Sequence, residues 1–199
     1  LRTPMHAILS FAQLGQKKLG DADAKASQYF QRIQESGKRL LSLINDVLDI
    51  SKVDSGKIEL HPEPYVYADY ISNIRNMFEP LCLQKNITFR IETEPEVAVL
   101  MVDRIRLNQI TLNLLSNAVK YTPAGGTVTF STRTRALSGG LLRCEIRVRD
   151  TGIGMSEAFQ RVMFEPFSQE YDNPGRPKAG SGTGLGLSIV RRIVELIGG

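Results

Sequence analysis

A row of amide side chains lies within one apolar-periodic stretch of the sequence. At roughly 100° per residue, four polar residues fall within about 80° of one another on a helical wheel: Gln109, Asn113, Asn117 and Lys120. The adjoining arc is apolar and consists of Leu107, Ile110, Leu114 and Ala118. A solvated helix face usually carries Glu and Lys, because Asn is a poor helix former. Since local conflicts of this kind gather at functional sites, the amides are candidates for binding a polar ligand.

A carboxylate ends a second patterned stretch, in which residues 143–150 alternate in polarity. One side of this stretch carries Cys144, Ile146, Val148 and Asp150, so we expect Asp150 to point into a buried layer. A buried carboxylate needs a hydrogen-bond donor, and the amino group of adenine is a suitable one. The alternative is a turn in which Asp150 accepts from its own loop while Gly152 and Gly154 supply positive φ angles.

A glycine-rich run, GSGTGLGL at residues 180–187, opens directly into an apolar-periodic stretch at 189–197. Glycines let backbone N–H groups approach an anion, and a helix N-terminus adds partial positive charge, so this pattern predicts a phosphate cradle. A Rossmann fingerprint would need a preceding strand, and the Walker lysine is missing. A flexible linker would not open into a periodic helix.

Two amphipathic helices are predicted within residues 1–52, because apolar residues recur there at spacings of three and four. Residues 20–23 (GDAD) read as a helix stop, a turn and an acidic helix start, which predicts an antiparallel hairpin. Two helices cannot cover their own apolar stripes. We therefore expect a homodimer in which two hairpins form a four-helix bundle.

The hydrophobic period changes after residue 52. Turn and breaker residues make 53–64 the expected linker. Beyond it the pattern predicts a helix over 67–84, strands near 87–91 and 97–101, and a helix whose N-cap is Asp103. Strands over 127–135 and 143–150 are expected to form an antiparallel hairpin. Helices packed on antiparallel strands give an α+β fold, a two-layer sandwich preceded by the helical hairpin.

Composition excludes several other classes of protein. The longest apolar run, 97–102, is far too short to cross a bilayer. The net charge of +4 comes from basic pairs scattered along the sequence, without the basic stripe and interleaved aromatics of a nucleic-acid binder. Two distant cysteines and two histidines support neither a zinc site nor a disulfide framework, which favours a reducing compartment.

Four motifs in this order resemble the asparagine, first glycine, phenylalanine and second glycine boxes of sensor histidine kinases. They are NLLSNAVKYT (113–122), DTGIG (150–154), FEPF (164–167) and GTGLGL (182–187). The opening LRTP also resembles the end of their histidine box. The resemblance implies a dimerisation and histidine-phosphotransfer hairpin at 1–52, a linker at 53–64, and an ATP-binding domain of the gyrase and chaperone type at 65–199. This last domain is expected to lack its final strands.

The resemblance also implies roles for individual residues. Asn117 is expected to ligate Mg²⁺ on the ATP phosphates, with Asn113 and Lys120 assisting catalysis. Asp150 is expected to accept from the adenine amino group. The expected nucleotide-binding residues are Asn113, Asn117, Lys120, Tyr121, Asp150, Gly152, Gly154, Phe167, Gly182, Thr183, Gly184, Leu185 and Gly186. Between 168 and 179 lies the expected lid, where Arg176 or Lys178 touches the γ-phosphate.

By the same resemblance, the chain is the kinase core of a two-component sensor. Such a core binds Mg-ATP and transfers the γ-phosphoryl group to a histidine, and then to an aspartate of a response-regulator receiver domain. The acceptor histidine is expected two positions before Leu1, so this fragment alone should not phosphorylate itself. Thr3 matches the position that orients water for dephosphorylating the receiver domain. We expect a cytoplasmic portion of a membrane-anchored bacterial sensor, with the anchor outside this sequence.

Two other functions are compatible with the sequence. An ATPase of the gyrase or chaperone class would have a water-activating glutamate where Asn113 stands, and an amide cannot take a proton. A non-enzymatic nucleotide-sensing or scaffolding module would keep the binding motifs without catalysis. Rapid ATP hydrolysis would favour the first alternative, and failure to bind Mg-ATP would exclude the kinase interpretation.

Overall fold

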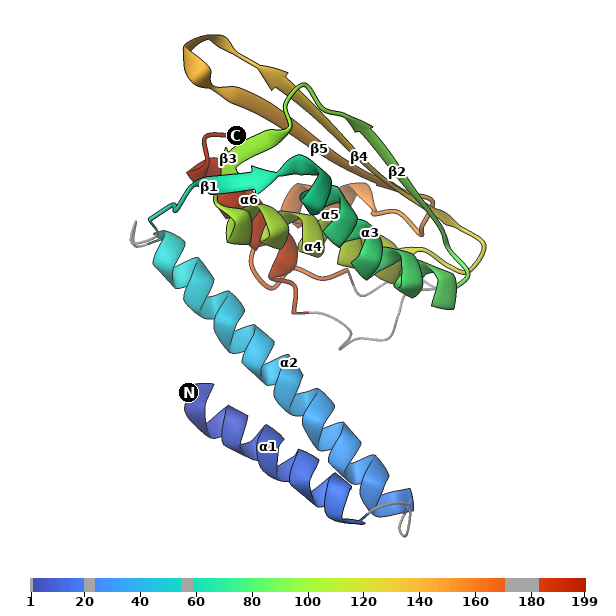
Figure 1. Ribbon diagram of the computed structural model, residues 1–199. Helices are drawn as coiled ribbons and strands as arrows, with labels where there is room; N and C mark the ends of the chain where they lie inside the picture. Colours follow the sequence, from blue (N-terminus) through green and yellow to red (C-terminus); the bar gives the residue numbers. More distant parts are fainter. Residues whose placement is uncertain (1, 20–23, 55–58, 171–182) are drawn as a thin grey trace. The chain divides into compact units, whose positions relative to one another are not determined.

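The computed structural model describes residues 2–19, 24–54, 59–170 and 183–199 (Figure 1). The chain divides into two compact units, Leu1–Lys57 and Ile58–Gly199.

The first unit is a helical hairpin of α1 (Arg2–Leu19) and α2 (Ala24–Asp54). The two helices pack along each other, with Ala12 buried between them at 4% exposure. A Cβ atom on Gly15 would lie 2.5 Å from Cε1 of Phe30, so glycine permits the close approach of α1 to α2. The hairpin confirms the sequence prediction. Helix α2 ends at Asp54, two residues beyond the expected end of the hairpin.

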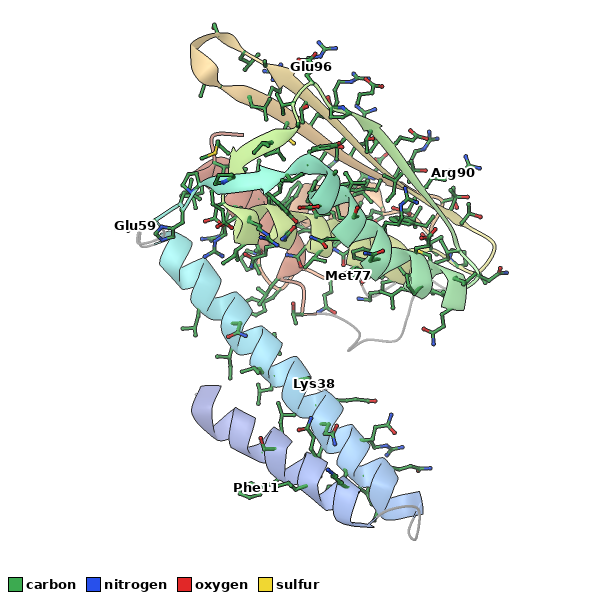
Figure 2. The ribbon with its side chains drawn as sticks, in the orientation of Figure 1. Phe11, Lys38, Glu59, Met77, Arg90 and Glu96 are labelled. Carbon is green, nitrogen blue, oxygen red and sulfur yellow. The ribbon has the colours of Figure 1, made fainter. Side chains whose placement is uncertain are left out.

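An apolar surface remains exposed on this hairpin. Phe11 on α1 is 71% exposed (Figure 2), and further apolar side chains with 40–63% exposure lie on both helices. They are Ile8, Leu14, Tyr29, Ile33, Leu40 and Leu48. A single copy of the hairpin therefore leaves much of its apolar surface in contact with water.

The described residues of the second unit form two small sheets. Strands β1 (Glu63–Val66) and β3 (Val99–Val102) pair antiparallel. Strands β2 (Thr88–Glu94), β4 (Thr127–Ala136) and β5 (Leu142–Asp150) form a three-stranded sheet in the order β2-β4-β5. The β4–β5 hairpin is antiparallel as predicted and is joined through a short 3₁₀ turn at Ser138–Gly140.

Two features of this sheet arrangement differ from the prediction. Strand β1 begins at Glu63, inside the stretch 53–64 that was expected to be a linker. Strand β2 pairs parallel with β4, although only antiparallel pairing was expected. The parallel pairing follows from the long connection between these strands, which runs through β3 and α4 and returns the chain in the same direction.

In the described part of this unit, the sheets are accompanied by the long helices α3 (Tyr67–Gln84), α4 (Arg104–Tyr121) and α6 (Gly186–Leu196). A short helix, α5 (Glu157–Val162), precedes the phenylalanine-containing turn. Helices α3 and α4 lie on one side of the three-stranded sheet (Figure 1). The core between helices and sheet includes Tyr70, Leu115 and Phe130, each fully buried. The α+β fold is therefore confirmed.

Helix α4 begins where the sequence predicted. The Asp103 side chain is the N-cap, and its Oδ1 accepts a hydrogen bond of 3.0 Å from the Arg106 N–H. Its Oδ2 accepts from the backbone N–H of His61 at 3.2 Å, which ties the segment before β1 to the start of α4. Leu107, Ile110 and Ala118 are buried as expected from the apolar arc. Leu115 is also fully buried, whereas Leu114 is half-buried.

Candidate functional site

The polar face of α4 carries the predicted amides. Asn113 and Asn117 are half-buried and lie one turn apart on the same face of the helix. At the C-terminal end of α4, the Nζ atom of Lys120 donates a 2.8 Å hydrogen bond to the Tyr121 hydroxyl. The same ammonium lies 4.4 Å from the centroid of the Tyr121 ring. The helix therefore presents two amide oxygens and a cation held against an aromatic ring.

The N-terminus of α6 lies beside the first of these amides. A Cβ atom on Gly186, the first residue of α6, would lie 3.2 Å from Oδ1 of Asn113. Among the described residues, no side chain caps this end of α6, and the first backbone N–H groups carry the positive potential of a helix N-terminus. Helix α6 has 11 residues and packs on α4. The structure thus brings the second glycine motif and the asparagine motif together.

The first glycine motif is held against the end of α4. The Ile153 N–H donates to the Tyr121 carbonyl oxygen at 3.2 Å. A Cβ atom on Gly152 would lie 2.5 Å from that same oxygen and 2.7 Å from Oδ1 of Asp150. Glycine is therefore required at position 152 by the close approach of two oxygen atoms.

Asp150 does not lie in a buried layer, and that prediction is wrong. The residue is exposed at the end of β5, and its Oδ1 accepts a 2.9 Å hydrogen bond from the Gly152 N–H. Val148, two residues earlier on the same side of the strand, is half-buried and packs against the core. Asp150 lies on the same side of β5 as Val148, but at the end of the strand, where no described element covers this side. The carboxylate is oriented by its own loop and stays accessible to a ligand.

The phenylalanine motif packs against the second glycine motif. Gly184 has a φ of +74°, and a Cβ atom on it would lie 2.7 Å from the backbone carbon of Phe167. Phe167 itself has a φ of +64° and a side chain that is 61% exposed. The positive φ of a bulky residue is costly and persists only where the surroundings hold it. Phe164 lies under the Arg191 guanidinium of α6, 6.0 Å from ring centroid to Cζ.

Other predicted residues take different places. Thr183 Oγ1 accepts a 3.2 Å hydrogen bond from the Leu185 N–H, and the Leu185 side chain is fully buried, so Leu185 offers a ligand only its backbone. Gly154 has a φ of +66° with open space around it. Thr3 lies in the first turn of α1. Three predicted residues, Arg176, Lys178 and Gly182, lie outside the described residues.

Sequence reasoning missed one residue that supports this site. The Nζ atom of Lys85, at the end of α3, donates to the carbonyl oxygens of Val119 at 2.6 Å and Lys120 at 2.9 Å. These are among the last carbonyls of α4, which have no partner within their own helix. Lys85 thus caps the end of α4 that carries Lys120 and Tyr121.

The neighbouring residue Asn86 completes this attachment. It adopts a φ of +56°, and its carbonyl oxygen accepts a 2.7 Å hydrogen bond from the Gly125 N–H in the turn after α4. The Thr88 N–H donates to the Gly126 carbonyl at 2.9 Å. The α3–β2 turn therefore holds both the end of α4 and the turn that leads from α4 to β4.

The donor set suits a hard cation bound together with phosphate. Amide oxygens, such as those of Asn113 and Asn117, are ligands that Mg²⁺ accepts while it keeps several waters and phosphate oxygens. Among the described residues, no cluster of three His, Cys, Asp or Glu side chains could hold a metal ion. Within the same part of the chain, no helix is both long and apolar enough to cross a bilayer.

Two family models match the chain. Residues 1–56 match the His Kinase A (phospho-acceptor) domain, and residues 102–199 match the histidine kinase-, DNA gyrase B-, and HSP90-like ATPase family. Together the two matches span most of the chain.

The chain also resembles curated bacterial sensor proteins over its full length. It is 38% identical over 201 residues to the autoinducer 2 sensor kinase/phosphatase LuxQ of Vibrio vulnificus (strain YJ016), covering 23% of that protein. It is 39% identical over 202 residues to the virulence sensor protein BvgS of Bordetella parapertussis, covering 16% of that protein. The chain thus spans less than a quarter of the length of either relative.

A solved structure resembles the chain over both units. The crystal structure of full-length ShkA in complex with AMPPNP is 31% identical, with a TM-score of 0.77. The match covers 99% of this chain and 39% of ShkA. The nucleotide-free catalytic domain of the histidine kinase ThkA is 25% identical, with a TM-score of 0.54 over 70% of this chain.

Proposed function

Because the chain belongs to the sensor histidine kinase family, we propose that it binds Mg-ATP at the site on α4 and transfers the γ-phosphoryl group of ATP to a histidine. One observation carries this proposal: the N-terminus of α6, which no described side chain caps, begins at Gly186, directly beside the Asn113 amide. Backbone N–H groups and a helix dipole at that point attract phosphate oxygens, and the amides of α4 lie next to them.

The base of the nucleotide is assigned to the first glycine loop. The Asp150 carboxylate, fixed through Oδ1 by the Gly152 N–H, presents its second oxygen to the adenine amino group. A charge-assisted hydrogen bond of this kind distinguishes adenine, whose exocyclic group donates, from guanine, whose corresponding oxygen only accepts. Gly152 leaves the room that such an approach requires.

The metal is assigned to the α4 amides. Asn117 would ligate Mg²⁺ through its side-chain oxygen, with Asn113 in the same hydrogen-bonded network. When bound, Mg²⁺ neutralises phosphate charge in phosphoryl transfer. Lys120 supplies a further positive charge toward the phosphates, and Tyr121 holds that ammonium in place. Phe167, Thr183, Gly184 and the backbone of Leu185 complete the proposed nucleotide surface.

A kinase fits these residues better than a hydrolase does. The position beside the α6 N-terminus is occupied by Asn113, whose amide cannot remove a proton from water. An imidazole nitrogen needs no such base, because neutral histidine is already a nucleophile near neutral pH. In the proposed transfer a histidine nitrogen forms the N–P bond while the bond from the γ-phosphorus to the bridging oxygen breaks, and ADP leaves.

The proposal extends to the partners of the longer protein. The exposed apolar side chains of α1 and α2 fit a second copy of the hairpin, which would close a four-helix bundle. The acceptor histidine is proposed to lie just before Leu1, and the phosphoryl group is proposed to pass on to an aspartate of a receiver domain. Thr3, in the first turn of α1, is proposed to orient water for the reverse dephosphorylation. The kinase core is proposed to lie on the cytoplasmic side of a membrane-anchored bacterial sensor.

Calorimetric titration with Mg-ATP tests the nucleotide site directly. We expect one site per chain, weaker binding when EDTA removes Mg²⁺, and slow hydrolysis of the bound ATP. Absence of binding would refute the proposal, and rapid hydrolysis would favour the gyrase-type ATPase. A longer protein that includes the residues before Leu1 tests the transfer itself, because labelled phosphate from ATP should appear on histidine as an acid-labile product.

A further inference from the structure

One face of the three-stranded sheet carries an unusual set of charges. Residues directly opposite one another in the β2-β4-β5 register share a face. The face away from the core carries six arginines and three glutamates, which gives a charge of +3. They are Arg90, Arg133, Arg135, Arg143, Arg147, Arg149, Glu92, Glu94 and Glu145. We call this surface the arginine face. The whole chain has a net charge of +4, so the arginine face accounts for most of it.

The arginine face is open to solvent. All six arginines are exposed, and Arg90 extends from β2 on the side away from α3 and α4 (Figure 2). Among the described residues, no helix or strand covers this face, because α3 and α4 pack on the opposite side of the sheet. The face is therefore available to a partner in the part of the molecule that the structure describes.

Ion pairs neutralise only the centre of the face. Arg133 pairs with Glu94 at 2.7 Å, and Arg147 pairs with Glu145 at 2.6 Å. The hydrogen bond and charge of Arg133 lower the pKa of Glu94. These pairs lie in neighbouring rows of the sheet, together with Ser131, which stands opposite Arg147. The central rows thus hold both signs of charge and are largely self-compensated.

The two ends of the face remain cationic. Arg135 and Arg143 stand directly opposite each other across β4 and β5. Arg90 and Arg149 flank Thr129 in the row at the other end. Within the described part of the chain, none of these four arginines forms an ion pair. Like charges directly opposite in a sheet are destabilising, so the Arg135–Arg143 pair is a local cost to the fold.

The chemistry of the face selects the kind of partner. Guanidinium groups bind carboxylates through two parallel hydrogen bonds, and arginine is enriched at protein interfaces. Nucleic acid or an anionic bilayer would set phosphates against the three central glutamates, and the face offers no aromatic side chain for stacking. A protein surface can place carboxylates at the two ends and neutral or basic groups at the centre.

We propose that the arginine face is a docking surface for an acidic protein surface, whose carboxylates pair with the arginines at its two ends. Leu137 and Leu141, at the tip of the β4–β5 hairpin beside Arg135 and Arg143, are 47% and 68% exposed and supply an apolar contact next to the cationic end. This inference is independent of the nucleotide site on the other side of the sheet.

The variant Arg143→Glu separates a binding role from a structural one. It replaces a repulsive pair opposite Arg135 with an attractive pair, so the urea midpoint of unfolding should rise while binding weakens. The probe is a short fluorescein-labelled glutamate peptide, followed by fluorescence anisotropy. Loss of a charge-assisted pair should weaken its binding by about tenfold. Lys38→Glu, an equal charge change at an exposed lysine of α2 (Figure 2), should leave peptide binding nearly unchanged.

The neutral variant Arg143→Ala controls for a structural effect of the new glutamate. It should also weaken peptide binding, although it adds no negative charge. Equal weakening by Arg143→Glu and Lys38→Glu would overturn the proposal, because binding would then follow net charge alone. Tighter binding of a DNA duplex or of phosphatidylglycerol vesicles than of the peptide, with dependence on Arg143, would also overturn it, in favour of a polyanion.

Discussion

Gly152 lies against the carbonyl oxygen of Tyr121, so closely that a Cβ atom on it would stand 2.5 Å from that oxygen. The contact joins the first glycine loop to the helix that carries the amides, with the hydrogen bond from the Ile153 N–H to the same oxygen beside it. The first glycine loop and helix α4, both parts of the proposed nucleotide site, therefore meet at the Tyr121 carbonyl oxygen.

Replacing Gly152 by alanine should move the loop away from α4 by about 1 Å, and a displacement of that size can cost about a hundredfold in activity. We expect Mg-ATP affinity, measured by calorimetry, to fall by about tenfold or more. Gly139→Ala is the control, since a Cβ atom on Gly139 would meet open space, although Gly139, unlike Gly152, has a positive φ. It should lower stability slightly and leave nucleotide affinity unchanged. Unchanged affinity in Gly152→Ala would contradict the geometry described for this loop.

Asn117→Ala should remove the proposed metal ligand on α4. We expect Mg-ATP affinity to fall by more than about tenfold, while the residual binding loses its dependence on Mg²⁺. Ser116→Ala, the adjacent exposed position on the same helix, controls for the change in helix composition. Titrations with and without EDTA distinguish the outcomes, and a variant that kept the full EDTA response would show that Asn117 does not hold the metal.

Lys85→Met should loosen the end of α4. Loss of two hydrogen bonds to the Val119 and Lys120 carbonyls is expected to lower the free energy of unfolding by about 1 to 3 kcal/mol. Nucleotide affinity should fall as well, because Lys120 and Tyr121 lie at that end, and Lys85→Arg should restore part of both.

The contrast is Arg75→Met, which breaks an exposed ion pair of 4.0 Å with Glu79. Such a pair contributes about 0 to 1 kcal/mol, so its loss should barely change urea unfolding. If Lys85→Met were as mild as Arg75→Met, the capping role of Lys85 would be excluded.

Phe11→Asp should prevent association of the hairpins. Phe11 is more exposed than Ile8 or Leu14, and a charge placed there would have to be buried in a four-helix bundle, which is costly. Analytical ultracentrifugation should find a dimer for the unchanged chain and a monomer for this variant. Gln13→Asp, at an exposed polar position of α1, should remain dimeric. A monomeric unchanged chain would contradict the expected bundle.

Thr111→Val should leave a buried phenol without its partner. The Tyr70 hydroxyl and Thr111 Oγ1 lie 2.7 Å apart, and both side chains are fully buried. We expect a loss of about 1 to 3 kcal/mol in unfolding free energy, and near-recovery in the double variant Thr111→Val with Tyr70→Phe, which removes both polar groups. Urea unfolding of the three variants forms the cycle. A double variant less stable than Thr111→Val alone would contradict this reasoning.

The same tyrosine predicts a loss of stability in alkali. Burial raises the pKa of Tyr70, against a smaller lowering by its hydrogen bond to Thr111. Below the ordinary tyrosine pKa of about 10, Tyr70 contributes fully to the free energy of unfolding. This contribution is lost as the pH rises toward the higher pKa that Tyr70 has in the folded state, because the unfolded chain ionises first. The free energy of unfolding should therefore begin to fall as the pH approaches about 10 and should keep falling above it. Tyr70→Phe should flatten that decline, and an equally steep decline in this variant would assign the effect to other groups.

Local signals in the sequence predicted much of the fold. The bounds of α3, Tyr67–Gln84, and the N-cap at Asp103 follow from short-range periodicity and capping, and both are confirmed. Parallel pairing of β2 with β4 could not be predicted in this way, because Thr88 meets Thr127 across a long intervening segment. The alternating pattern also assigned Asp150 to the correct side of β5. It carries no information about how far along the strand the packed core extends.

The candidate site was predictable where a motif is contiguous. Asn113, Asn117 and the glycine motifs can be found along the sequence, and the structure brings Asn113 and Gly186 together. Lys85 could not be found, because its acceptors lie 34 and 35 positions further along the chain and a lysine at a helix end usually points to water. Contacts between distant segments are fixed by tertiary packing alone.

The parallel ladder between β2 and β4 also fixes an order of events during folding. Strand β2 cannot pair with β4 until the chain has been made through residue 127 and beyond, whereas α4 needs only its own residues and neighbouring contacts. Helices form in microseconds, and ladders between distant strands close slowly. On a growing chain, the helix that carries the amides can therefore form before the sheet against which it finally packs.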